Sequence, residues 1–147
     1  MHLLLPALLL CAAPFAAADD LTKETESQLL ARILKDTNKT SQGVFEELGS
    51  RKTRNSLNAL EKGFTEITGN PALKNACKAF RHYRGVDGLE RSAITTLYAA
   101  AQDQKLTRQR YAAYGLAHFP DAARAELDRL VERSGDEITR ANALAGL

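Results

Sequence analysis

Residues that could perform chemistry are few in this sequence of 147 residues. Beyond residue 18 the histidines are His82 and His118, and the one cysteine is Cys77. A structural zinc site needs four nitrogen or sulfur ligands, which these residues do not supply. The sequence also contains no HExxH motif, glycine-rich phosphate loop or nucleophile elbow. We therefore expect no metal, no cofactor and no catalysis.

One pair of residues could be imagined as a catalytic dyad, namely the thiol of Cys77 and the imidazole of His82. Cys77, however, falls on an apolar stripe with Leu73, Ala76 and Phe80. Burial on such a stripe raises the pKa of a thiol and leaves it unreactive. We expect a reduced cysteine in the core.

Positive charge is concentrated in the middle of the sequence, where residues 51–91 hold nine Lys and Arg against four Asp and Glu. Lys74, Lys78 and Arg81 follow one another at i, i+4 and i+7, with Arg84 adjoining. This spacing places them on one face of a helix. The row predicts a binding face for an acidic partner. The alternative is a solvated face, partly neutralised by the acidic N-terminal segment.

The N-terminus has the pattern of a secretory signal peptide. An apolar run begins at Leu3, and three alanines ending at Ala18 precede the first charged residue, Asp19. Small residues at the end of an apolar run mark a signal-peptidase site. We therefore expect cleavage near Ala18 and export to the periplasm or the medium. The run from Leu3 to Ala18 has 16 residues and two prolines. Because a membrane span needs about 20 residues, no integral span is expected.

The composition of residues 19–147 predicts helices and no sheet. These residues include 18 Ala and 16 Leu against 3 Val and 4 Ile. Ala and Leu favour helix, whereas β-branched residues favour strands. The whole chain is 44% hydrophobic, which suffices for a packed core. Its formal net charge of +2 is too small for a nucleic-acid binder, so the expected partner is another protein.

Apolar residues at helical spacing predict where the helices lie. Leu57, Leu60, Phe64 and Ile67 step by three, four and three residues, which predicts a helix over 53–67. Similar stripes predict further helices over 20–36, around 44–48, over 71–83, from 88, over 104–118, from 121 and from 137. We expect Asp121 to cap the helix that starts there, and Ser134 together with Glu137 to cap the last helix.

The predicted helix starts form two interleaved series. One series is 52, 88 and 121, with steps of 36 and 33; the other is 71, 105 and 137, with steps of 34 and 32. Helix pairs that repeat every 30–40 residues are typical of an α-solenoid, in which neighbouring pairs stack to bury their apolar faces.

The segment from Ile138 to Leu147 resembles the second helix of a HEAT-like repeat, with Arg140 near its start, closely packing alanines and a terminal Gly-Leu. Leu106 to Leu116 is a weaker copy, with Arg108 or Arg110 in the corresponding place. This resemblance implies a right-handed α-solenoid that holds other proteins and has no shared chemistry.

Two other interpretations of the helices stay open. Tyr111 and Tyr114 are similar to packing positions of tetratricopeptide-like repeats, but Gly115 and Ala122 stand about four residues too close together for that pattern. A non-repetitive helical bundle would also contain helices of similar length.

We predict an all-α protein with a signal peptide over 1–18, a helical extension over 19–50 and about three HEAT-like helix pairs over 51–147. The predicted function is that of an exported, non-catalytic protein–protein interaction scaffold. The alternatives are a small helical inhibitor or immunity protein of a secreted or periplasmic enzyme, and an unrecognised helical hydrolase.

The apolar run from Ala143 to Leu147 lacks the polar outer face of a terminal repeat. It predicts self-association through the C-terminal helix.

Overall fold

The computed structural model describes residues 20–147, so the predicted signal peptide lies outside the described residues. Within 20–147 the chain forms helices joined by turns, without a strand, which confirms the all-α prediction. The α-helices are α1 (Glu26–Lys35), α2 (Gln42–Ser50), α3 (Arg54–Glu66), α4 (Asn70–Ala79), α5 (Glu90–Ala100), α6 (Leu106–Leu116), α7 (Arg124–Arg133) and α8 (Glu137–Leu144). Two 3₁₀ helices add to them, η1 (Leu21–Lys23) before α1 and η2 (Phe80–Tyr83), which continues α4.

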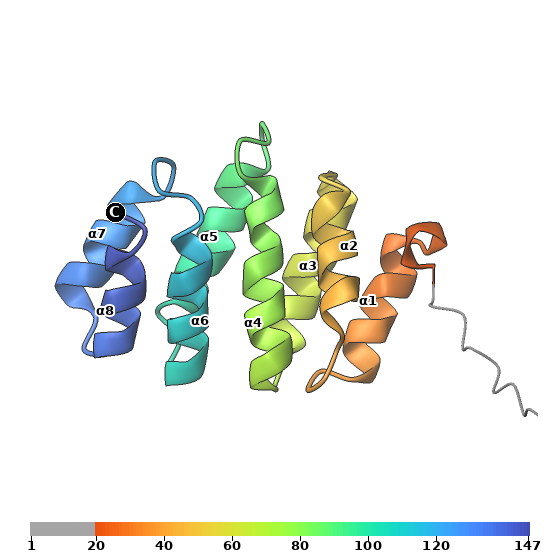
Figure 1. The fold of residues 1–147 in the computed structure, drawn as a ribbon, viewed down its shortest axis with the longest axis horizontal. Coiled ribbons are helices and arrows are strands. Elements are labelled where there is room, and N and C mark those ends of the chain that lie inside the picture. Colours follow the sequence, from red (N-terminus) through yellow and green to blue (C-terminus); the bar gives the residue numbers. More distant parts are fainter. Residues whose placement is uncertain (1–19) are drawn as a thin grey trace, which may run out of the picture.

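The helices lie in two rows (Figure 1). We call α2, α4, α6 and α8 the front row and α1, α3, α5 and α7 the rear row. In the front row α2 packs against α4, α4 against α6 and α6 against α8, and in the rear row α1 packs against α3 and α3 against α5. The predicted N-terminal extension forms α1 and α2. Of these, α1 packs against α3 and α2 packs against α4, so they continue the two rows.

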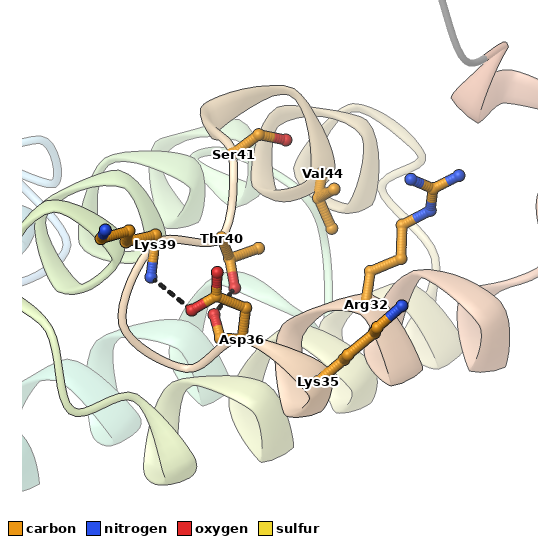
Figure 2. A pocket seen from close by; sticks show the side chains of 7 residues that line it. All are labelled: Arg32, Lys35, Asp36, Lys39, Thr40, Ser41 and Val44. Atoms are coloured by element: carbon orange, nitrogen blue, oxygen red, sulfur yellow. Dashed lines mark hydrogen bonds between the residues drawn. The ribbon is translucent and has the colours of Figure 1, made fainter.

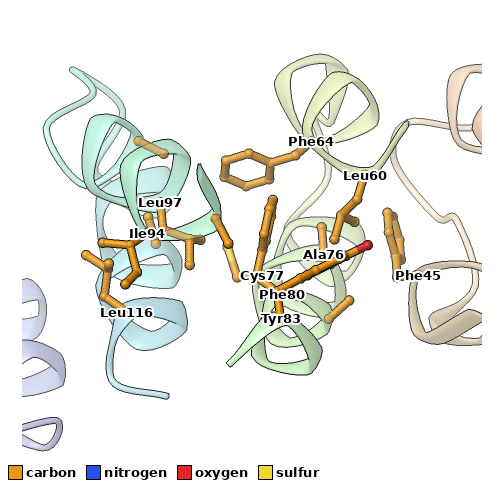
Figure 3. Close-up of a cluster of buried hydrophobic side chains, with 14 of the residues drawn as sticks. Phe45, Leu60, Phe64, Ala76, Cys77, Phe80, Tyr83, Ile94, Leu97 and Leu116 are labelled. Atoms are coloured by element: carbon orange, nitrogen blue, oxygen red, sulfur yellow. The ribbon is translucent and has the colours of Figure 1, made fainter. Parts of the chain in front are cut away.

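The core is one continuous cluster of buried side chains that runs between the rows from Leu29 in α1 to Ala143 in α8. Its centre lies between the middle helices (Figure 3). There the ring of Phe64 meets that of Phe80 edge to face, with the centroids 5.6 Å apart. Edge-to-face aromatic pairs of this kind add to the stabilisation that burial provides.

Small residues let neighbouring front-row helices approach closely. A Cβ atom on Gly115 of α6 would lie 2.9 Å from a methyl group of Leu97 and 3.1 Å from the carbonyl oxygen of Cys77 in α4. Ala112 and Ala113 are fully buried beside it. The many alanines of the sequence therefore serve tight packing as well as helix propensity.

Helix starts fall within three residues of the predicted ones, at 54, 90 and 124 in the rear row and at 70, 106 and 137 in the front row. The predicted helix over 20–36 is divided, because Thr25 forms a capping box with Gln28 and starts α1 there. Two predicted caps are wrong. Ala123, not Asp121, occupies the N-cap of α7. Asp136, not Ser134, caps α8 by accepting from the backbone N–H of Thr139.

Polar side-chain contacts join successive helices of the rear row. In the rear row the Glu61 carboxylate of α3 accepts hydrogen bonds from the hydroxyls of Ser92 (3.0 Å) and Thr96 (2.9 Å) on α5. One pair further along, Arg91 of α5 donates to Glu126 of α7 at 2.6 Å. The partners in these contacts are 31 to 35 residues apart. Polar contacts thus link α3 to α5 and α5 to α7.

None of the helices in residues 20–147 is both long and apolar enough to cross a bilayer.

Candidate functional site

The four predicted binding residues lie in one continuous stretch of the front row, from α4 to just after η2. Lys74 and Lys78 project from α4, Arg81 follows in η2, and Arg84 comes directly after η2. Lys74 and Arg84 are exposed, whereas Lys78 and Arg81 are half-buried. We call these four residues the basic row.

Two carboxylates partly neutralise the basic row. Nη2 of Arg81 lies 3.2 and 3.1 Å from the two carboxylate oxygens of Glu46 on α2. The guanidinium of Arg84 lies 3.9 Å from the exposed carboxylate of Asp121, a weak pair in water. Among the described residues, Lys74 and Lys78 take part in no ion pair. The four cations and two carboxylates therefore leave a formal charge of +2 on this surface.

Glu46 also binds His82, whose Nε2 lies 2.6 Å from the carboxylate. Partial burial raises the pKa of Glu46, but the hydrogen bond from His82 and the charge of Arg81 outweigh burial, so its pKa is lowered overall. The carboxylate stays ionised at neutral pH and holds Arg81 and His82 together across the α2–α4 contact.

Beside the basic row, α6 and the turn after it carry a second line of side chains, which the sequence analysis did not predict to be a binding surface. Thr107, Tyr111 and Tyr114 on α6 and His118, two residues beyond its end, follow at i, i+4, i+7 and i+11, and the last three are half-buried. We call this line the aromatic row. The rings of Tyr114 and His118 meet edge to face, with the centroids 5.1 Å apart. The helical spacing of these residues could have indicated from the sequence that they form a line. Only the packing of α6 on α4 places the aromatic row next to the basic row.

His118 shows how close the two rows lie. Its pKa is lowered, first by burial and then by the positive charges of Arg81, Lys78 and Arg84. Its Nε2 atom is buried and has no hydrogen-bond partner within residues 20–147. Both observations favour the neutral imidazole. The aromatic row is therefore an uncharged strip next to a charged one.

At the N-terminal ends of the front-row helices lies a groove of about 370 Å³. It is lined by Asn70, Thr107, Arg110, Tyr111, Ile138 and Asn142. Ile138 is 48% exposed, and Leu106, next to Thr107 in the chain, is 51% exposed. The groove thus combines exposed aliphatic surface with two amide side chains, which can both donate and accept hydrogen bonds.

One wall of this groove is held in place by an ion pair. Nη2 of Arg110 lies 2.7 Å from Oδ1 of Asp136, and Asn142 donates from Nδ2 to the carbonyl oxygen of Arg110 at 2.9 Å. The hydrogen bond from Arg110, followed by that from Thr139, holds the pKa of Asp136 far below its usual value. Arg110 and Asn142 are therefore fixed before any ligand arrives.

A larger cavity, of about 630 Å³, lies at the turn between α1 and α2 (Figure 2). Its lining includes the cations Arg32, Lys35 and Lys39. Arg32 pairs with Glu24, and the Asp36 carboxylate accepts the backbone N–H of Lys39 at 2.9 Å. The exposed side chains of Lys35, at the end of α1, and of Lys39, in the turn, give this cavity a positive rim.

The thiol–imidazole dyad does not form. Cys77 is fully buried (Figure 3), and burial strongly raises the pKa of its thiol. His82 instead binds Glu46. The core position predicted for Cys77 is confirmed. Among residues 20–147 no group of three or more His, Cys, Asp and Glu is arranged to hold a metal ion.

Comparison of the chain with protein-family models, curated proteins and solved structures gives no match. A function must therefore be inferred from the residues of the chain itself.

Proposed function

We propose that this chain is an exported, non-catalytic scaffold that binds another protein through its front row. The observation that carries this proposal is the juxtaposition of the basic row on α4 and η2 with the aromatic row on α6, on helices that pack directly together. Tyrosine and arginine are enriched at protein–protein interfaces, and the positive charge of the lysines attracts an acidic partner.

We further propose that the helices form a right-handed α-solenoid of HEAT-like repeats. The starts of the rear-row helices α3, α5 and α7 are spaced by 36 and 34 residues, and those of α4, α6 and α8 by 36 and 31. The recurring contacts at 31 to 35 residues, such as that from Thr96 to Glu61, support the same period. In such arrays each unit contacts mainly its neighbours, and one long face is free to bind partners.

Export is proposed from the sequence pattern of residues 1–18, with cleavage near Ala18 and release into the periplasm or the medium. The chain would then bind its partner protein in that compartment.

One observation favours a second candidate, an acid–base site at Glu46 and His82, whose atoms lie 2.6 Å apart. A catalytic pair needs a base that is free to take up a proton. Here Arg81 also binds the carboxylate, and the lowered pKa of Glu46 makes it a poor base. A structural ion pair between α2 and η2 accounts for the arrangement better.

The test of the scaffold is capture of proteins from the exporting cell's envelope fraction by the purified chain. Lys74→Glu/Lys78→Glu reverses two exposed or half-exposed charges of the front row. Lys62→Glu/Arg124→Glu is the matched control, because these residues are exposed on rear-row helices. We expect a defined partner to be lost with the front-row variant and kept with the control. Equal capture by both variants would contradict the proposed surface.

A further inference from the structure

The front row presents two chemistries side by side, and each addresses a different part of a ligand. The basic row offers Lys74 and Lys78 without ion-pair partners among the described residues. The aromatic row offers the half-buried rings of Tyr111 and Tyr114. Because α4 packs directly on α6, and packed helix axes lie about 8–10 Å apart, one extended chain can touch both rows.

The groove at the N-terminal ends of α4, α6 and α8 supplies a third contact. Its volume of about 370 Å³ is at the lower end of the roughly 300–1,000 Å³ typical of ligand pockets. It is therefore suited to side chains rather than to a folded domain. Asn70 of the groove and Lys74 of the basic row are one helical turn apart on α4, so the groove and the charges are continuous.

The polar groups of the groove suit a peptide backbone. Asn142, which donates from Nδ2 to the carbonyl oxygen of Arg110, lines the groove, and Asn70 contributes a second amide. An amide side chain can both donate to and accept from a peptide backbone. Arg110 is held by Asp136, so binding does not require this wall to become ordered. Preorganisation of this kind improves affinity because less conformational entropy is lost on binding.

We propose that this surface takes an extended acidic segment of a partner protein that also carries an apolar side chain. The inference rests on the proposed scaffold function and specifies its ligand. Carboxylates of the segment lie along Lys74 and Lys78, and the apolar side chain enters the groove against Tyr111 and Ile138.

The same surface is less suited to a uniform polyanion. Glu46 and Asp121 compensate two of its four cations, whereas nucleic-acid binding relies on neutralising many phosphates. The exposed aliphatic surface of Ile138 and Leu106 gains nothing from a phosphate backbone. It is stabilising when another apolar group covers it.

The experiment measures fluorescence anisotropy of labelled 12-residue probes with the purified full chain at low salt. The first peptide contains Glu, Ser and a central Phe; the second has Ser in place of Phe; the third has Gln in place of Glu. A single-stranded 12-nucleotide DNA is the fourth probe. We expect the first peptide to bind tightest, and each of the other probes about tenfold more weakly or worse.

Variants assign the two contacts separately. Ile138→Ser, at an exposed position, is expected to weaken the first peptide about tenfold and to leave the second unchanged. Lys74→Glu/Lys78→Glu is expected to weaken both acidic peptides, and the rear-row control Lys62→Glu/Arg124→Glu neither. Thermal unfolding followed by circular dichroism checks that each variant is folded.

Three results would overturn the inference: DNA binding as tight as the first peptide, equal affinity with and without Phe, or no binding of any acidic peptide. If the inference alone is wrong, capture of an envelope protein still depends on the front row. If the scaffold function is wrong, that capture is lost as well or ceases to depend on Lys74 and Lys78.

Discussion

Glu46 joins two consecutive helix pairs through one carboxylate. Arg81 and His82 both reach it from η2, at 3.1 and 2.6 Å, although 35 and 36 residues separate them from it in the chain. The charge of Arg81 is therefore neutralised by Glu46, and this ion pair stabilises the contact between α2 and η2. The free charge available to a partner lies mainly on Lys74 and Lys78.

The free energy of unfolding should depend on pH because the carboxylate of Glu46 titrates. The pKa of Glu46 is lowered from its ordinary value of 4.5 in the folded chain. Its contribution is therefore complete above that value and is lost as the pH falls through the folded-state pKa. We expect Glu46→Gln to reduce the free energy of unfolding by about 1 kcal/mol at pH 7, and the difference from wild type to shrink as the pH falls below 4.5.

Urea unfolding at a series of pH values measures this, with Glu132→Gln, at an exposed position of α7, as the control. A difference that stays constant down to the lowest pH would show that the charge of Glu46 contributes nothing.

Cys77 is expected to remain reduced and unreactive in the native chain, because it is fully buried and its thiol pKa is raised. Cys77→Ala leaves a small cavity and should cost about 1 kcal/mol. The measurement is the rate of labelling by a thiol reagent, with and without urea. Rapid labelling of the folded chain would place Cys77 outside the core.

At the scale of the elements, Arg108 ties α6 to the end of α3. Its guanidinium donates to the carbonyl oxygens of Phe64 (3.1 Å) and Ile67 (3.0 Å) and lies over the Phe64 ring, 5.0 Å from the centroid. The last carbonyls of α3 have no partner within their own helix. An arginine fork can satisfy several of them at once.

Arg108→Ala should therefore lower the free energy of unfolding by about 2 kcal/mol, and Arg108→Lys should restore less than half of this loss, because lysine lacks the planar fork. Arg133→Ala, at an exposed position, is the control. Chemical denaturation measures all three. Full rescue by lysine would mean that charge alone matters here.

The positions of the helices could be predicted from the sequence because apolar spacing and helix propensity are local properties. Leu57, Leu60 and Phe64 are buried in α3 as their spacing required. The ion pair between Arg110 and Asp136 could not be predicted, since 26 residues separate the two in the chain. Likewise, the shared face of Lys74 and Lys78 follows from their spacing. Its neighbours, Glu46 and the aromatic row, depend on which helices pack against α4.

At the scale of the whole molecule, α8 exposes apolar side chains. Leu144 is 56% exposed and Leu147, beyond the end of the helix, is 42% exposed. We expect the chain to self-associate through this helix, and Leu144→Glu/Leu147→Glu to keep it monomeric, because burying an exposed leucine is worth about 1.5–3 kcal/mol.

Sedimentation velocity over a wide concentration range tests this expectation. Leu34→Glu, at an exposed position of α1, is the control and should leave the association unchanged. A wild-type chain that stays monomeric at high concentration would contradict the prediction.

The central claim is that the front row of a stacked helical array binds a partner protein. Amide hydrogen exchange of the chain, alone and with a partner captured from the envelope fraction, tests it most directly, because exchange reports the stability of each helix separately. We predict that the partner slows exchange in α4, η2, α6 and the start of α8 and leaves α3, α5 and α7 unchanged. Protection confined to the rear row would contradict the claim.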